Sequence, residues 1–280
     1  MREIVVLSGK GGTGKTSLTG ASTVLGLQAV WADCDVDAAN LHLLLNPEVQ
    51  ERVPFYGGKK PAVNKEECSE CGLCTELCRY DAIKNGVIDE LNCERCALCY
   101  HVCPEKAISL EDELSGHIYR TSTPYGPFIY AELGVAQENS GKLVSQVKQH
   151  ARELARKEGS DYIIVDGPPG VGCPVIASIS GAHLALIVTE PTMAGQHDLE
   201  RIVQLAGHFS VPVAVVINKW DLDEDRASEM ESICRERDID VVGKIPFERK
   251  VVAAQVNGVA SLQGAVYKPF AKVWERVLQK

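Results

Sequence analysis

Two lysines in a glycine-rich run near the start of the chain have the clearest potential for chemistry. Residues 9–16, GKGGTGKT, match GxxxxGK[ST], the pattern of a phosphate-binding loop. The glycines let successive backbone N–H groups turn toward one anion, and a following helix N-terminus adds positive potential. In such a loop Lys15 reaches the β- and γ-phosphates, and the Thr16 hydroxyl binds Mg²⁺. The predicted nucleotide contacts of the loop are Gly9, Lys10, Gly11, Gly12, Thr13, Gly14, Lys15, Thr16 and Ser17.

Eight cysteines form a second chemical signature, because they fall into two quartets with the same C-x₂-C-x₂-C-x₃-C spacing. This is the spacing of bacterial two-cluster ferredoxins, in which the fourth cysteine of each quartet binds the other cluster. It predicts two [4Fe–4S] clusters, one on Cys68, Cys71, Cys74 and Cys103 and the other on Cys93, Cys96, Cys99 and Cys78. A zinc ribbon is the alternative, but it needs only two C-x₂-C pairs.

Aspartates that follow two apolar runs are further candidates for metal binding. Asp166 ends one run and precedes the segment Gly167–Gly170. A carboxylate at the end of a buried strand supports Mg²⁺ directly or through water when a phosphate loop is present. Asp33 and Asp35 follow the run Ala29–Ala32, where an α/β nucleotide-binding protein places groups near the γ-phosphate. Aspartates at such positions can equally cap the first turn of a helix.

The elements that must position the loop are a strand and a helix. Ile4–Leu7 is an apolar run typical of a buried strand, and Leu18–Leu25 has apolar residues at helical spacing. The loop also contains GxGxxG, with Asp33 about 20 residues further on, which is the pattern of a dinucleotide-binding turn. Lys15 and Thr16 favour the phosphate loop, because a pyrophosphate-binding turn needs neither an ammonium group nor a metal-bound hydroxyl.

Apolar runs alternate with helical patterns along the rest of the chain. This alternation predicts an α/β fold with a mostly parallel sheet covered on both faces. Together with the phosphate loop and the cysteine quartets, it predicts a three-layer P-loop NTPase into which a small α+β ferredoxin-like domain is inserted. A composition break begins at Pro47 and continues to Pro61. The predicted domains are 1–56 and 116–280 for the ATPase part and 57–115 for the insert. We also expect strands at His183–Thr189, Val213–Asn218 and Val241–Pro246, a helix at Ser140–Lys157, and a hairpin of Ile118–Thr121 with Phe128–Ala131.

Three features together resemble the MinD/ParA/Mrp family of ATPases, to which the nitrogenase iron protein also belongs. They are the second loop lysine, Lys10, the DxD…NL run from Asp33 to Leu41, and the DxPxG loop from Asp166 to Gly170. The resemblance implies Mg²⁺ with ATP or ADP as ligand. It also implies a nucleotide-dependent homodimer, in which Lys10 reaches the nucleotide of the partner subunit.

The resemblance assigns roles to further residues. It implies that Asp35 orients the attacking water and that Asp33 supports the Mg²⁺ shell, with Lys10, Lys15 and Asp35 as the catalytic set. Asn218, Lys219 and Pro246 match positions at which the family contacts adenine, although turn chemistry could also explain them. Cys173, seven residues after Asp166, is either a small buried residue or a group that meets its copy across a dimer, and Cys34 is expected to be buried.

Composition narrows the class of protein. The chain has 280 residues, 45% of them hydrophobic, with a net charge of −9, and this acidity argues against nucleic acid as a partner. Eleven cysteines without an export signal are typical of metal ligands in a cytoplasmic protein. The last segment has an apolar face around Phe270 and Trp274. Core packing is expected there, and contact with a membrane surface is the alternative.

Two functions fit these features. One is an ATP-binding and ATP-hydrolysing enzyme that couples its nucleotide state to iron–sulfur electron transfer or metallocluster maturation, stimulated by a redox or client protein. The other is a positioning or scaffold ATPase of the MinD kind, whose ferredoxin domain senses redox state or docks a partner.

Overall fold

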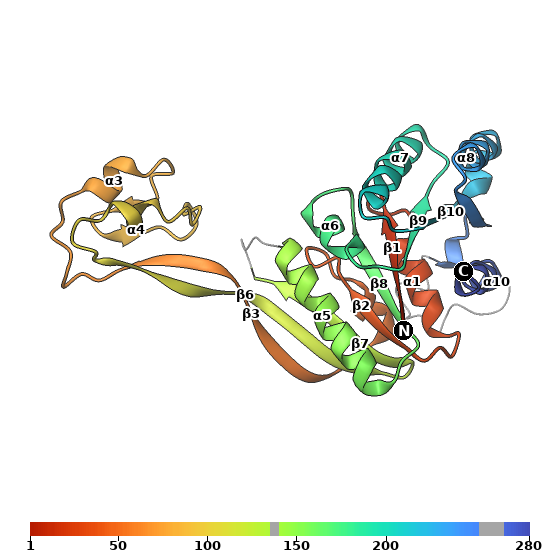
Figure 1. Cartoon of the computed structure of the whole chain (residues 1–280), viewed down its shortest axis with the longest axis horizontal. Helices are drawn as coiled ribbons and strands as arrows, with labels where there is room; N and C mark the ends of the chain where they lie inside the picture. Colours follow the sequence, from red (N-terminus) through yellow and green to blue (C-terminus); the bar gives the residue numbers. More distant parts are fainter. Residues whose placement is uncertain (135–139, 252–265) are drawn as a thin grey trace. The chain divides into compact units, whose positions relative to one another are not determined.

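A computed structural model of the chain describes residues 1–134, 140–251 and 266–280. It contains two compact units, each with its own packing (Figure 1). The sheet unit comprises Met1–Val53, Ile118–Glu132 and Ser140–Lys280. The cysteine unit is built mainly from Pro54–His117. The long strands β3 (Glu48–Val63) and β6 (Ile108–Thr123) run from one unit into the other.

A nine-stranded sheet organises the first unit, in the order β11-β10-β9-β1-β8-β2-β7-β6-β3. The pairs β1/β8, β1/β9, β9/β10, β10/β11, β2/β8 and β2/β7 are parallel, which confirms the mostly parallel α/β fold. Successive residues of the central strands are buried, because helices cover both faces of the sheet. The remaining strands are β1 (Arg2–Ser8), β2 (Ala29–Asp33), β7 (Gly126–Leu133), β8 (Tyr162–Pro169), β9 (Leu184–Thr189), β10 (Val213–Asn218) and β11 (Asp240–Ile245).

Two groups of helices in this unit can be distinguished by what they pack against. Side chains of α1 (Lys15–Thr23), α2 (Leu41–Leu45) and α10 (Lys268–Leu278) share one core cluster with alternate residues of the strands. Helices α5 (Ser140–Glu158) and α6 (Cys173–Ile179) pack against each other and against β8. The unit also contains α7 (Met193–His208), the 3₁₀ turn η1 (Trp220–Leu222) and α8 (Glu224–Glu236).

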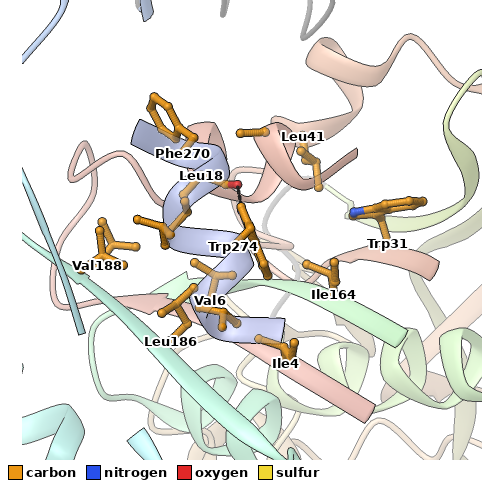
Figure 2. Close-up of a cluster of buried hydrophobic side chains, with 14 of the residues drawn as sticks. Ile4, Val6, Leu18, Trp31, Leu41, Ile164, Leu186, Val188, Phe270 and Trp274 are labelled. Atoms are coloured by element: carbon orange, nitrogen blue, oxygen red, sulfur yellow. Dashed lines mark hydrogen bonds between the residues drawn. The ribbon is translucent and has the colours of Figure 1, made fainter. Parts of the chain in front are cut away.

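The core cluster ties the last helix to the helix of the phosphate loop. Figure 2 shows Trp274 between the strands and α1, where its indole N–H donates to the Leu18 carbonyl over 2.8 Å. Phe270 and Trp274 are both buried, so the apolar face of α10 packs in the core, as expected from the sequence. Within the described residues, no helix is long and apolar enough to cross a membrane.

The predicted composition break does not interrupt the backbone. Pro54, Gly57 and Pro61 all lie inside β3, a strand of 16 residues at the end of the sheet order. Proline lacks an N–H donor and is tolerated on such an edge strand. The predicted hairpin is confirmed with longer strands, since β6 and β7 are joined at Pro124–Tyr125. The predicted helix 140–157 and the three later strands are confirmed as well.

The cysteine unit repeats its backbone as well as its sequence. The helices α3 (Leu73–Leu77) and α4 (Leu98–Val102) pack together, and each ends at the fourth cysteine of its quartet. Each follows a residue in the left-handed region, Gly72 at φ 77° and Ala97 at φ 60°. A two-residue pairing joins β4 (Ile83–Lys84) to β5 (Val87–Ile88). The buried hydrophobic residues are few, and include Ala82, Ile83, Ala107 and Ile108, so this unit has only a small apolar core.

Candidate functional site

The glycine-rich loop connects β1 to α1 and requires glycine at several positions. Gly12 and Gly14 have φ values of 80° and 96°, in the left-handed region that favours glycine. A Cβ on Gly9 would lie 2.0 Å from the Cβ of Asp198, so no larger residue fits there. This backbone lines a cavity of about 450 Å³, a size that suits a small-molecule ligand.

The cavity brings together most of the residues predicted to bind nucleotide. It extends from the loop to the end of β11, and the predicted residues that line it are Gly11, Gly12, Thr13, Gly14, Lys15, Thr16, Ser17, Asp35, Asn218, Lys219 and Pro246. Gly9, Lys10, Asp33 and Asp166 lie outside this lining. Apolar groups, among them Phe247 and Phe270, complete the end near β11.

Lys15 is the cation of the cavity. Its ammonium group is nearly buried and lies 3.0 Å from Asp166 Oδ1 and 3.6 Å from Asp35 Oδ2. Burial lowers the pKa of Lys15, but Asp166, Asp33 and Asp35 outweigh burial and raise it, so the amine stays charged. The contact with Asp166 is an ion pair. Among the described residues, neither Lys15 Nζ nor the buried hydroxyl of Thr13 has a hydrogen-bond partner. Phosphate oxygens are acceptors that could satisfy both groups.

Asp166 lies under the loop, with its side chain fully buried. Its Oδ2 accepts a hydrogen bond from Thr16 Oγ1 over 2.7 Å, and its Oδ1 accepts one from Thr19 Oγ1 over 3.0 Å. The hydroxyl and the carboxylate expected at Mg²⁺ are therefore adjacent. Oxygen ligands of this kind are those that Mg²⁺ prefers.

Asp33 is also buried, and its carboxylate is engaged by the backbone. It accepts N–H groups from Asp35, Asn40 and Leu41 over 3.0 to 3.1 Å. Burial, and after it the neighbouring Asp166, raise the pKa of Asp33 to about 7, although Lys15 and the backbone donors oppose the shift. These contacts anchor the start of α2, as the capping interpretation expects; the role in the Mg²⁺ shell stays a prediction.

Glu190 joins the two lysines that border the loop, and the sequence patterns did not single it out. Lys10 Nζ lies 3.0 Å from Glu190 Oε2, and Lys219 Nζ contacts Glu190 Oε1. Burial would raise the pKa of Glu190, but the two lysines outweigh burial and lower it. Glu190 follows β9, the neighbour of β1 in the sheet. Its position at the carboxyl end of that strand is the signal that could have identified it.

The cysteine unit contains two cavities lined by the predicted cluster ligands. One is lined by Cys68, Cys71, Cys74 and Cys103, and the other by Cys74, Cys78, Cys93, Cys96 and Cys99. Each cavity thus combines the first three cysteines of one quartet with the fourth cysteine of the other, and the second cavity also includes Cys74. In the part of the chain that is described, no three His, Cys, Asp or Glu side chains converge on a point that could hold one ion. The corners of a cubane are different iron atoms, so its thiolates surround it and need not converge.

The other three cysteines differ in exposure. Cys34 is buried as expected, and burial raises the pKa of its thiol. Cys234 is also buried, on the inner side of α8, and burial raises the pKa of its thiol to about 11. Cys173 is exposed at the start of α6, which corrects the interpretation of this residue as a buried one.

Comparisons with known proteins identify the family. The model of the CobQ/CobB/MinD/ParA nucleotide binding domain matches residues 4–262. An uncharacterized protein of Methanocaldococcus jannaschii is 35% identical over 220 residues, which is 78% of each chain. An iron-sulfur cluster carrier protein of the same organism is 23% identical over 297 residues, covering 99% of this chain and 84% of the relative. The septum site-determining protein MinD of Pyrococcus horikoshii, solved with Mg-ADP, has a TM-score of 0.61 at 17% identity, covering 99% of this chain and 95% of that one. The chain therefore belongs to the CobQ/CobB/MinD/ParA family of nucleotide-binding domains and is a MinD/ParA-like P-loop ATPase.

Proposed function

We propose that this protein hydrolyses Mg-ATP and couples its nucleotide state to an iron–sulfur task, either electron transfer or metallocluster maturation. The observation that carries the proposal is the grouping of the cysteines. Cavities that each combine the first three cysteines of one quartet with the fourth cysteine of the other occur in a chain that also carries a phosphate loop. One polypeptide would thus carry the residues for ATP hydrolysis and for iron–sulfur chemistry.

The residues around the phosphate loop fit a Mg-nucleotide. Lys15 Nζ and the Thr13 hydroxyl are buried donors whose bonds would be completed by phosphate oxygens. Thr16 and Asp166 would hold Mg²⁺ between them, and the metal would neutralise charge on the phosphates. Asp35 lines the cavity and carries an acceptor that can orient a water molecule. Lys10 is 41% exposed and is free to reach toward a second subunit once it leaves Glu190.

Stimulation by a partner is part of the proposal. Among the described residues that line the cavity, none is an arginine. An arginine that neutralises transition-state charge raises the rate of P-loop NTPases by about 10³–10⁵-fold. We therefore expect slow turnover by the isolated protein, and faster turnover when a dimer or a client protein completes the site.

The cysteine unit fits two [4Fe–4S] clusters, which supply one-electron transfer when bound. Its apolar core is small, so metal–thiolate bonds would contribute a large share of its stability. Cys71 and Cys96 are the exposed ligands of the two sets, which would leave each cluster accessible to an electron carrier. The distant similarity to an iron-sulfur cluster carrier protein supports an iron–sulfur role without specifying it.

A positioning or scaffold ATPase is the second candidate, favoured by the fold similarity to MinD. One experiment separates the two. We would measure cluster midpoint potentials by EPR titration of the Asp35→Ala protein with Mg-ATP and with Mg-ADP, and ATP affinities of the oxidised and reduced protein. Coupling must be reciprocal, and a tenfold effect corresponds to about 60 mV for a one-electron couple. Identical potentials and identical affinities would leave only the scaffold function.

A further inference from the structure

A carboxylate of the same subunit holds the side chain of Lys10. Lys10 Nζ lies 3.0 Å from Glu190 Oε2, and 41% of the lysine side chain is exposed. The main chain of Lys10 is fixed separately, because the Ser8 hydroxyl donates to the Lys10 carbonyl over 2.9 Å. An ion pair with a partner this exposed is weak. The ammonium group can therefore exchange Glu190 for another anion while the phosphate loop keeps its shape.

Glu190 is anchored independently of Lys10. Its Oε1 accepts a hydrogen bond from Lys219 Nζ, which also donates to the Gly12 carbonyl over 3.0 Å. The Glu190 carbonyl accepts the N–H of Thr192, the residue that caps α7, over 2.7 Å. Only 12% of the Glu190 side chain is exposed. Glu190 thus keeps its position and one cationic partner when Lys10 leaves.

The Lys10–Glu190 pair opposes the contact that Lys10 would make across a dimer. In a symmetric dimer each subunit contributes the same surface, so both copies of Lys10 must leave Glu190 before they reach the nucleotide of the other subunit. The free energy of breaking the pair therefore enters the dimerisation equilibrium twice. The phosphates of a nucleotide carry several negative charges, against one on the Glu190 carboxylate, so they can attract Lys10 more strongly.

We propose that Glu190 restrains nucleotide-dependent dimerisation, by holding Lys10 within its own subunit until the phosphates of a nucleotide in a second subunit replace it. The inference rests on the proposed dimer and concerns the residue that opposes its formation. In this role Glu190 touches no phosphate, and it is a positioning residue that acts through Lys10. Removal of its charge should therefore tighten the dimer, provided that Lys10 is present.

The experiment measures the dimer dissociation constant of the full chain by sedimentation equilibrium, at saturating Mg-AMP-PNP, so that neither hydrolysis nor nucleotide affinity affects the result. The variant is Glu190→Gln, which keeps an oxygen for Lys219 and removes the charge. The matched control is Glu231→Gln, which removes the same charge from another partly buried ion pair, with Lys244 at 3.0 Å. Glu231 lies on α8 and is outside the lining of the nucleotide cavity.

Glu190→Gln is expected to tighten the dimer by about twofold to 25-fold, because an exposed ion pair shifts an equilibrium by up to about fivefold and each dimer breaks two pairs. The ratio between wild type and variant should shrink as NaCl is raised, since salt screens the pair. A purely steric role of Glu190 would leave that ratio constant. Glu231→Gln should match the wild type. In the Lys10→Ala background, Glu190→Gln should have no effect.

Three results would overturn the inference and leave the dimer standing. They are a Glu190→Gln dimer no tighter than that of the wild type, an equal effect of Glu231→Gln, and an undiminished effect of Glu190→Gln without Lys10. A wild type that binds Mg-AMP-PNP by calorimetry and still sediments as a monomer, together with all its variants, would overturn the proposed dimer and this inference with it.

Discussion

The raised pKa of the buried Asp33 carboxyl predicts how the free energy of unfolding depends on pH. Its pKa is raised from 3.8 to about 7 in the folded protein, first by burial and then by Asp166. Between these two values the folded state binds a proton that the unfolded state does not, so stability falls as pH rises from about 4 to about 7. Each pKa unit corresponds to about 1.4 kcal/mol, and between pH 5 and pH 8 the loss is about 3 kcal/mol.

Asp33→Asn removes this titration, since the carboxamide stays neutral. We expect the free energy of unfolding of the variant, minus that of the wild type, to rise by about 3 kcal/mol between pH 5 and pH 8. Part of any constant offset comes from the carboxamide N–H₂, which cannot accept the backbone N–H groups that now donate to both oxygens. The change of this free-energy difference between pH 5 and pH 8 does not depend on that offset.

Urea unfolding followed by tryptophan fluorescence is a suitable measurement, in EDTA and without nucleotide. The three tryptophans, Trp31, Trp220 and Trp274, all belong to the sheet unit, so the signal reports the unfolding of that unit. Asp37→Asn is the matched control, because Asp37 is an exposed aspartate of the same segment. Parallel pH profiles for wild type and Asp33→Asn would show that the carboxyl does not titrate as its burial requires.

Three further outcomes are expected. Lys15→Ala should abolish nucleotide binding measured by calorimetry, since it removes the cation that pairs with two carboxylates and would meet the phosphates. Asp35→Ala should keep binding and lose phosphate release, and unchanged turnover in both variants would contradict the ATPase role. Anaerobically purified protein should contain about eight iron and eight sulfide per chain, and Cys68→Ser should damage one cluster by EPR and spare the other; stoichiometric zinc would argue against the clusters. Asp35→Ala should sediment as a dimer with ATP and as a monomer with ADP, and Lys10→Ala should remove that difference, so sedimentation that ignores nucleotide would exclude the dimer.

Local patterns in the sequence were sufficient for the elements of the sheet. The phosphate loop, the hairpin and the helix of α5 follow from glycine placement, turn residues and apolar spacing, which act over a few residues. The role of Pro54 and Pro61 did not follow, because a proline is compatible with a strand only when that strand lies at an edge. Edge position depends on sheet order, which is a property of the whole unit.

The same reason separates the site residues that were found from those that were missed. Asp166 and Thr16 were predicted because each belongs to a motif with a fixed spacing, and the structure places them within hydrogen-bond distance. Glu190 was missed because its contact with Lys10 exists only when β9 lies beside β1. The contact of Asn218 with the base came from the resemblance alone and stays a prediction, and the hydrogen bond from its amide to Thr13 was not expected. The order of the strands in the sheet decides which strand ends meet. Patterns over a few residues of one sequence do not determine that order.

Contacts inside the sheet unit link the loop after Asp166 to the helices α6 and α5. The loop Gly167–Gly170 leads into α6, and the Lys148 ammonium of α5 donates to carbonyls at the other end of that helix, those of Ala177, Ser178 and Ser180. Lys148 also pairs with Glu3 at the start of β1 over 2.9 Å.

Lys148 is itself nearly buried, and burial lowers its pKa, while the Glu3 carboxylate opposes this shift. A buried ion pair of this kind is costly to break, so it holds α5 to the start of β1, while the bonds from Lys148 to the three carbonyls hold α5 to the end of α6. A Cβ on Gly141 would lie 3.3 Å from that of Cys173, so the first turns of the two helices also touch. Helix α5 begins directly after the second stretch of chain that belongs to the cysteine unit. A displacement of the loop after Asp166 would therefore reach α6, which contacts α5 at both ends.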